Sequence, residues 1–449
     1  MKFLEDARKL IGIDSTPGHG NLAAAEFCAR ICEDAGLSVE MQKENWDGLD
    51  QCNLIARPPG KAPSREFLLQ THLDTVEAGH FSHWNKTQSN PFNASIYENE
   101  IYGLGTADAK LDFLCKIAAI SQVMEKKPSW KLPPVLVGTY GAQSGMAGAI
   151  KLIRRKKIQA VQALVGEPTE MRLSNAGTGH AIVEIAVPFS EHERTYRRDH
   201  DLMESTTSQS RYFSGRAAHS ADPTLGENAI MKMLEYLTQL PEGIVVMDLS
   251  GGINDNSVPA SAFLEVDLVA GCKDPLLPKI LKIYSSLQTL QTRLLEFQEV
   301  GMKPPHATMN IGRIRTNEAE VVLSGSCRLP PSVTDSVYQA WMSDLDSAVR
   351  EGGATFRVKD YRRGFQTPEN TKFVQQAQDV LNDMGLGSQL AKIALTSEAN
   401  VFARLGVECL VWGPGQSVGN SHAPNERISI KDLELAVEFY RRVIERVCL

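Results

Sequence analysis

The feature of this sequence that most restricts its fold is an alternation of short apolar runs with stretches of helical periodicity. Runs such as 67–69, 134–139 and 159–165 have the length and composition of buried strands. Helices that alternate with such strands are typical of an α/β domain with a mostly parallel, helix-flanked sheet. Functional side chains of these sheets gather at the carboxyl ends of the strands. The residues that follow each run are therefore where we expect a site.

The size and composition of the chain exclude several other classes of protein. It has 449 residues, 42% of them hydrophobic, which is enough for two or three domains with their own cores. Its net charge of −7 argues against general nucleic-acid binding. No apolar run approaches a membrane span, and Glu5 and Asp6 stand where a secretory signal would be apolar. The eight cysteines lack zinc-finger spacing, so we expect a cytoplasmic protein with reduced thiols.

The middle of the sequence differs in pattern from its two ends. Several stretches there alternate apolar and polar residues, as antiparallel strands with one exposed face do. This pattern predicts that residues 176–331 form an inserted α+β domain with an antiparallel sheet. It also predicts one discontinuous α/β domain around it, made of residues 1–175 and 332–449. Polar segments near 190–211 and 272–305 are expected to be insertions within the middle domain.

Polar side chains follow the predicted strands of the first domain. His72 and Asp74 come soon after one strand, Glu167 closes another, and Asp108 precedes a helix. Residues two apart in a strand point to the same side, so a carboxylate at position 74 can fix the ring of a metal-binding histidine. With His422 near the C-terminus, these residues offer mixed ligands that suit zinc or a similar divalent ion. Their types alone leave a purely structural role open.

Five motifs follow one another along the chain: His72-x-Asp74-Thr75, Gly105-Thr-Ala-Asp108-Ala-Lys110, Gly166-Glu167-Pro168-Thr169, Gly215-Arg-Ala-Ala-His219-Ser220 and His422-Ala-Pro-Asn-Glu426. In this order they resemble the co-catalytic zinc amidohydrolase family, which includes acetylornithine deacetylase, succinyl-diaminopimelate desuccinylase, aminoacylase and the glutamate carboxypeptidases. The resemblance covers nearly the whole chain. It implies a metal-dependent hydrolase of amide bonds in N-acyl amino acids or small peptides. It also implies that the middle domain is a lid and dimerisation domain, through which the protein forms a homodimer.

The resemblance implies a role for each metal-site residue. His72 and Glu167 are expected to bind one metal ion, and His422 and the residue at position 143 a second. Asp108 is expected to bridge the two ions, and Asp74 to orient the ring of His72.

The resemblance also implies contacts with the substrate. His219 resembles the lid histidine that stabilises a developing oxyanion. Asn256 and Arg328 resemble lid positions that contact the substrate. Glu398, within Thr396-Ser397-Glu398-Ala399, matches the acetylornithine deacetylase branch of the family. The alternative for Asn256, Arg328 and Glu398 is ordinary turn or surface chemistry.

The chain departs from the family pattern after the fourth strand of the first domain. The family carries Asp-Glu-Glu there, in which the first Glu is the general base and the second is a metal ligand. Alignment through the flanking residues places Ala142 at the base and Gln143 at the ligand. No Asp or Glu lies between residues 131 and 163, so shifting the alignment restores neither role.

This departure has two consequences. Gln143 offers a neutral oxygen and offsets no charge, so we expect one well-bound zinc, cobalt or manganese ion and a second ion that is weak or absent. A general base contributes ~10²–10⁴-fold to a rate, and Ala142 can accept no proton.

Three functions stay open: a hydrolase of reduced or altered activity, a pseudoenzyme whose cleft binds a ligand or partner, and a structural dimer whose cleft residues have changed without selection. The retained ligands argue against the third.

Overall fold

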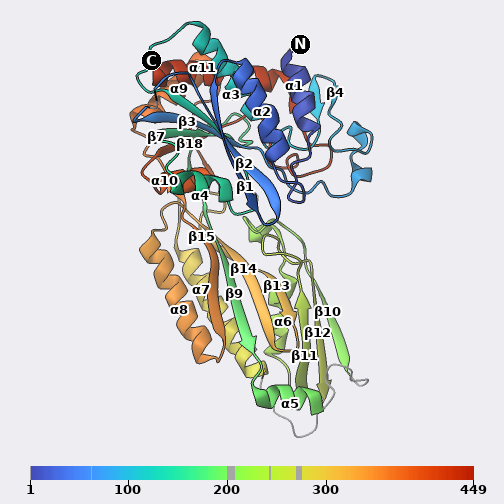
Figure 1. Cartoon of the computed structure of the whole chain (residues 1–449). Coiled ribbons are helices and arrows are strands. Elements are labelled where there is room, and N and C mark those ends of the chain that lie inside the picture. The colour runs from blue at the N-terminus through green and yellow to red at the C-terminus, as the bar shows by residue number, and fades with distance from the viewer. Residues whose placement is uncertain (1, 62, 143, 200–207, 242–243, 269–275) are drawn as a thin grey trace. The chain divides into compact units, whose positions relative to one another are not determined.

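The computed structural model describes residues 2–61, 63–142, 144–199, 208–241, 244–268 and 276–449. They form two compact units, shown in Figure 1. The first unit comprises Met1–Gly177, Phe365–Lys392 and Ser397–Leu449, and the second comprises Thr178–Gly364 and Ile393–Thr396. Each unit is therefore discontinuous in sequence.

The first unit is built on a sheet whose four central strands are parallel. Its strands are β1 (Ser38–Trp46), β2 (Leu49–Arg57), β3 (Glu66–His72), β6 (Pro134–Thr139), β7 (Ala160–Val165), β8 (Ser174–Gly177), β16 (Phe365–Gln366), β17 (Ala391–Ile393) and β18 (Glu408–Val411). Their order is β1-β2-β6-β3-β7-β18-β8-β16, with β17 beside β8. Strands β6, β3, β7 and β18 run parallel, and β1–β2 and β8–β16 add antiparallel pairs at the edges. The predicted α/β class is confirmed.

Helices cover both faces of this sheet. They are α1 (Lys2–Ile11), α2 (Leu22–Asp34), α3 (Lys110–Glu125), α4 (Ala147–Arg154), α9 (Lys372–Asp383), α10 (Ala399–Ala403) and α11 (Ile430–Cys448). Buried apolar residues of α1, α2, α3, α9 and α11 share one core with alternate residues of the strands. Figure 1 shows α4 and α10 on the other side of the strands from α3 and α11. The sheet is therefore flanked by helices, and its central strands are buried on both faces.

A small antiparallel sheet joins two loops of the first unit. It contains β4 (Ser95–Tyr97), β5 (Glu100–Tyr102) and β19 (Arg427–Ser429) in the order β19-β5-β4. The pair β5–β19 holds the segment before α3 beside the segment before α11. This sheet thus brings together residues more than 300 positions apart in the chain.

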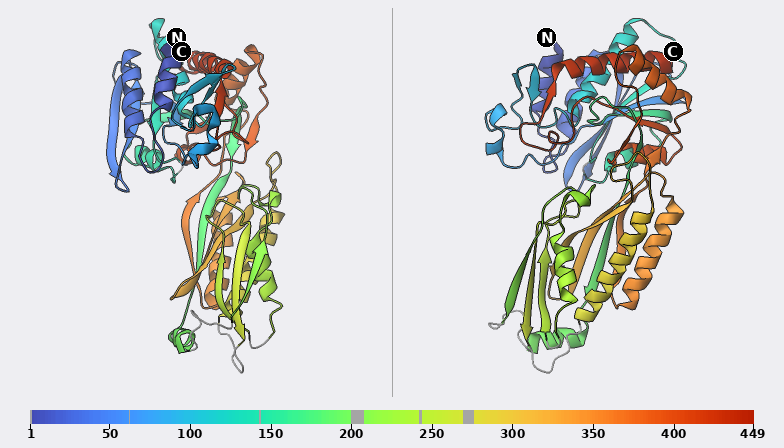
Figure 2. Two further views of the ribbon diagram at one scale, coloured as in Figure 1. Left: turned by 90° about the vertical axis from the view of Figure 1, so that its right-hand side faces the viewer. Right: turned by 180° about the vertical axis from the view of Figure 1, so that it is seen from behind.

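The second unit contains an antiparallel sheet with helices on one face. Its strands are β9 (Gly179–Pro188), β10 (Gln209–Ser214), β11 (Ile244–Gly251), β12 (Ser261–Leu268), β13 (Thr308–Thr316), β14 (Glu320–Leu329) and β15 (Thr355–Arg362), in the order β10-β12-β11-β13-β14-β9-β15. The helices are α5 (Glu191–Asp199), α6 (Ala229–Leu237), α7 (Leu277–Glu296) and α8 (Asp335–Glu351). Figure 2 shows α6, α7 and α8 over one face, where their apolar residues form a single core with the strands. The predicted α+β pattern is confirmed.

The second unit extends beyond the boundary predicted at residue 331. Residues 332–364, which the sequence assigns to the first domain, contain α8 and β15. Strand β15 pairs along the length of β9, and α8 buries Trp341 and Leu345 in the core of the second unit. A helix followed by a strand occurs in both kinds of domain. The local pattern therefore does not reveal which sheet the strand joins.

The polar segment 190–211 contains regular structure that its sequence does not suggest. It shows neither helical nor strand periodicity, yet Glu191–Asp199 form α5. The backbone N–H of Ser190 donates to Oε2 of Glu193 at 2.5 Å, and the backbone N–H of Glu193 donates to Oγ of Ser190 at 3.1 Å. This reciprocal pair is a capping box, which starts the helix without an apolar stripe. Residues 200–207 lie outside the described part of the chain.

Two expectations about the whole chain can be compared with the described residues. No helix among them is long and apolar enough to cross a membrane. The seven cysteines that the structure describes are buried and free of disulfides, and Cys272 lies outside that part of the chain.

Candidate metal centre

His72 is the last residue of β3 and is almost fully buried, at 2% exposure. Its Nδ1 lies 2.9 Å from the main-chain carbonyl oxygen of Asp74, whereas Oδ1 of the Asp74 carboxylate is 3.7 Å away. A neutral imidazole that donates from Nδ1 to a carbonyl keeps its lone pair on Nε2. The backbone after β3 therefore aims Nε2 as the ligand atom.

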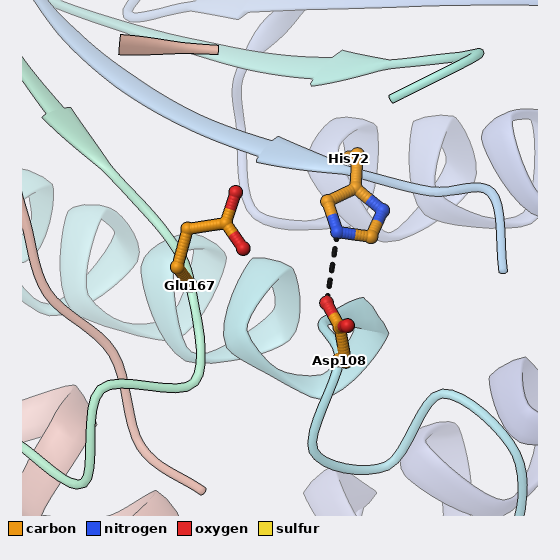
Figure 3. A group of neighbouring side chains, drawn as sticks. All are labelled: His72, Asp108 and Glu167. Carbon is orange, nitrogen blue, oxygen red and sulfur yellow. Dashed lines mark hydrogen bonds and ion pairs between the residues drawn. The ribbon is translucent and has the colours of Figure 1, made fainter. Parts of the chain in front are cut away.

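Two carboxylates converge on this nitrogen, as Figure 3 shows. Oδ1 of Asp108 lies 3.0 Å from Nε2 of His72. Glu167 follows β7, and its carboxylate belongs to the same group. One ligand atom from each of His72, Asp108 and Glu167 lies within 4.8 Å of the other two. One imidazole and two carboxylates at this spacing are a ligand set that a divalent ion such as zinc accepts.

His422 approaches the same centre from the loop before β19. Its Nε2 lies 2.6 Å from Oδ2 of Asp108, so this carboxylate contacts one imidazole through each oxygen. The side chain of His422 is 45% exposed, in contrast to that of His72. Asp108 thus has the two-sided contacts that a bridging carboxylate needs.

The loop that carries Asp108 is held in place by Glu426. Oε1 of Glu426 accepts hydrogen bonds from the backbone N–H groups of Ala107, at 2.8 Å, and Asp108, at 3.0 Å. Glu426 is 1% exposed and lies close to the β5–β19 pair. The sequence motif contains Glu426, but sequence reasoning gave it no role, because its partners are more than 300 positions away.

A buried ionic network supports the strand ends from the α3 face. Nζ of Lys116 donates to the carbonyl of Gln70 at 2.6 Å and to Oγ1 of Thr71 at 2.7 Å, and it pairs with Asp112 at 2.7 Å. This network lies directly against Gly166, where a Cβ atom would be 2.0 Å from the Asp112 carboxylate. Only glycine fits at position 166, so the backbone just before Glu167 packs directly against this network.

The electrostatics of the centre favour a cation. Burial, together with the nearby charge of Asp108, raises the pKa of Glu167 to about 8. Burial opposes ionisation of Asp108 as well, but hydrogen bonds from His422 and His72 hold its pKa below the usual value. Burial also disfavours the His72 imidazolium, yet Asp108, Asp74 and Glu167 raise its pKa well above normal. The negative charge of these buried carboxylates favours protonation of the two imidazoles. A divalent ion can offset the same charge, so the residues fit a metal.

Most of the predicted first-unit residues meet at this centre. The structure brings together His72, Asp108, Glu167 and His422, with Asp74 adjacent. Ala142 lies in the turn after β6, and Gln143 lies outside the described residues. Glu398 is buried on the β3–β6 strands, where its Oε2 accepts from Oγ1 of Thr139 at 2.6 Å.

The predicted residues of the second unit gather around a histidine that sequence reasoning missed. His180 on β9 pairs in register with Arg328 on β14 and with Arg362 on β15. Burial, followed by the charges of Arg328 and Arg362, lowers the pKa of His180 to about 3; a hydrogen bond with Asn256 opposes this shift, and the charge of His219 adds to it. Nη1 of Arg328 donates to Oγ1 of Thr396 at 3.3 Å. The unit thus places a neutral His180 between two guanidinium groups at the beginning of β9, and that of Arg362 pairs with Asp360 at 3.0 Å.

Comparison with known proteins supports the resemblance seen in the sequence. The model of peptidase family M20/M25/M40 matches residues 68–446. Acetylornithine deacetylase of Myxococcus xanthus is 22% identical over 452 residues, covering 98% of this chain and 96% of that protein. The enzyme of that name from Proteus mirabilis is 24% identical over 465 residues, with coverages of 100% and 97%.

Solved structures share the fold. Aminoacylhistidine dipeptidase of Vibrio alginolyticus has a TM-score of 0.64 at 16% identity, covering 99% of this chain and 96% of that one. A dinuclear metal-binding peptidase of Bacillus subtilis has a TM-score of 0.56 at 9% identity, with coverages of 98% and 96%. The family match spans well over half of the sequence. The chain therefore belongs to peptidase family M20/M25/M40.

Proposed function

We propose that this protein is a metal-dependent hydrolase that cleaves the amide bond of N-acyl amino acids or small peptides. The observation that carries the proposal is the convergence of His72, Asp108 and Glu167 within 4.8 Å, in a chain that belongs to a peptidase family. The full-length similarity to acetylornithine deacetylases supports an acylated amino acid as the substrate. Ala142 at the general-base position makes the activity lower than, or different from, that of the relatives.

The metal chemistry follows from the ligands. His72, Asp108 and Glu167 would hold one zinc, cobalt or manganese ion. His422 and Asp108, with Gln143 as a weak ligand, would hold a second ion less tightly or not at all. A bound divalent ion would polarise the amide carbonyl and lower the pKa of a water molecule.

The second unit supplies the remaining contacts in this proposal. His219 would stabilise the oxyanion, and Asn256 and Arg328 would bind the substrate. The guanidinium of Arg328 suits the free carboxylate of an N-acyl amino acid. We also propose a homodimer through this unit, which the resemblance supports, and a cytoplasmic location, which the free cysteines support.

The second candidate is a pseudoenzyme that keeps the cleft to bind a ligand or partner. The observation that favours it is Ala142, which can take no proton. A turnover assay separates the candidates, with the zinc-, cobalt- or manganese-loaded protein acting on N-acetylornithine, N-acetylcitrulline, N-succinyl-diaminopimelate and dipeptides. Turnover that His72→Ala abolishes and that the exposed control His80→Ala retains supports the hydrolase. Thermal stabilisation by a ligand without turnover supports the pseudoenzyme.

A further inference from the structure

One buried carboxylate of the first unit has no place in the metal set described above. Glu398 is 1% exposed and immediately precedes α10. Its Oε2 accepts hydrogen bonds from Oγ1 of Thr139, at 2.6 Å, and from Nε2 of Gln70. Its Oε1 is also buried and has no hydrogen-bond partner among the described residues. Burial of an oxygen without a hydrogen-bond partner costs free energy, and a catalytic role is one reason for a protein to keep such a group.

The two hydrogen-bond donors place this carboxylate on the same face of the sheet as His72. Gln70 and His72 are two residues apart on β3, so their side chains point the same way. Thr139 pairs in register with His72 across the parallel β3–β6 pair. The alternate residues Phe67 and Leu69 share the core with α3 and α11, so Gln70 and His72 point to the opposite side of the strands, where Figure 1 shows α4 and α10. Glu398 therefore lies beside the metal centre.

Glu398 is also close to the place where the family's base is missing. Thr139 is the last residue of β6, and Ala142 lies in the turn three residues later. The alternation of side chains and the hydrogen bond to Thr139 bring the carboxylate of Glu398 to the start of that turn. A carboxylate lost from the turn is therefore accompanied by one on a neighbouring element.

The charges around Glu398 come from the metal centre. His72 and Asp74 act on its carboxylate, and Glu398 in turn acts on Glu167. Burial raises the pKa of Glu398 to about 7, while the hydrogen bond from Thr139 and the charge of His72 oppose the rise. A carboxyl group that exchanges its proton near neutral pH suits general base and general acid catalysis.

We propose that Glu398 is the catalytic carboxylate that carries the proton in place of the base missing at Ala142. The inference rests on the proposed hydrolase function. A water molecule adds its oxygen to the amide carbonyl carbon and gives one proton to Glu398. Glu398 returns that proton to the nitrogen as the carbon–nitrogen bond breaks. The products are a carboxylic acid and an amine, and the Glu398 carboxylate is regenerated.

The test is Glu398→Gln in the zinc-loaded protein. Glutamine has nearly the same volume and still accepts both hydrogen bonds, but it cannot take the proton. We expect kcat to fall by ~10²–10⁴-fold, while KM, the zinc content and the substrate affinity measured by calorimetry stay within ~3-fold. The matched control is Glu66→Gln, which changes another 1% exposed glutamate at the opposite end of β3, paired there with Arg57. It should lower thermal stability without lowering kcat.

A rescue variant distinguishes proton transfer from a structural role. Adding Ala142→Glu to Glu398→Gln returns a carboxylate to the turn. We expect kcat of this double variant to be at least ~10-fold higher than that of Glu398→Gln alone. A Glu398→Gln protein that keeps full kcat would overturn this inference and leave the proposed function intact. If Glu398→Gln loses zinc or fails to fold, and Ala142→Glu does not restore activity, Glu398 has a structural role and the inference is wrong. Absence of wild-type turnover on every substrate would overturn both the inference and the proposed function.

Discussion

The Nδ1 atom of His72 is bound by the main-chain carbonyl of Asp74 at 2.9 Å, not by its carboxylate, whose Oδ1 is 3.7 Å away. Substitution of the Asp74 side chain leaves that carbonyl in place. We therefore expect Asp74→Asn to weaken zinc binding by less than ~10-fold, at or below the low end of the range for residues that orient metal ligands. His72→Ala should abolish high-affinity binding.

Competition with a chromogenic chelator measures both affinities. His80→Ala, which removes an exposed imidazole of the same unit, is the control for non-specific zinc binding. A loss beyond ~100-fold in a folded Asp74→Asn protein would mean that the carboxylate, rather than the carbonyl, orients the ring.

Metal occupancy is the second prediction. Protein purified without chelators should contain one tightly bound ion per chain, because only His72, Asp108 and Glu167 form a close set among the described residues. Gln143→Glu should add a negative charge to the second site and raise its occupancy toward one. Elemental analysis after gel filtration measures both. Two tightly held ions in the wild type would contradict the prediction.

The fold was predictable because the strands of each sheet have their own pattern of apolar residues in the sequence. Buried runs such as 134–139 predict parallel strands, and alternating stretches predict the antiparallel sheet of the second unit. The assignment of residues 332–364 was not predictable. Their helix and strand look alike in either unit, and only the pairing of β15 with β9 decides where they belong.

The site was predictable only where order and residue type carry the information. His72, Asp108, Glu167 and His422 were found because four motifs occur in family order, and the structure brings these residues together. Lys116 gave no signal, since a lysine on a helix usually lies in solvent. Its burial depends on partners that the fold, not the local sequence, supplies.

The buried pair of Lys116 and Asp112 leads to the third prediction. Both side chains are almost fully buried, and the pair is 2.7 Å apart. Lys116→Met should lower the free energy of unfolding by ~3–5 kcal/mol, because it leaves the Asp112 carboxylate buried without its cation. Lys126→Met is the matched control, since its ion pair with Glu445 is exposed and should cost at most ~1 kcal/mol.

Urea unfolding followed by fluorescence measures these free energies. The double variant Asp112→Asn with Lys116→Met should be more stable than Lys116→Met alone, because it removes the uncompensated charge. A double variant that is less stable than the single one would show that the hydrogen bonds that Asp112 accepts from Thr71 and Tyr440 matter more than its charge.

His180 gives the fourth prediction, a loss of stability in acid. Burial, followed by Arg328 and Arg362, lowers its pKa to about 3 in the folded protein, whereas an unfolded chain binds the proton near pH ~6.5. Between these values the unfolded state holds more protons, so stability falls as the pH drops from ~6.5 toward 3, by up to ~1.4 kcal/mol per pH unit. Above pH ~6.5 this contribution is complete and constant.

His180→Gln should remove that slope, because glutamine does not titrate. The free energy of unfolding of the variant, measured from pH 7 to pH 4.5, should change less steeply than that of the wild type. The control, His83→Gln, alters an exposed histidine and should keep the wild-type slope. Identical slopes in His180→Gln and the wild type would mean that His180 is protonated in the folded state despite the adjacent guanidinium groups. The carboxylate of Asp360, which lies 3.0 Å from Arg362 and 4.0 Å from Nδ1 of His180, would then stabilise the protonated ring.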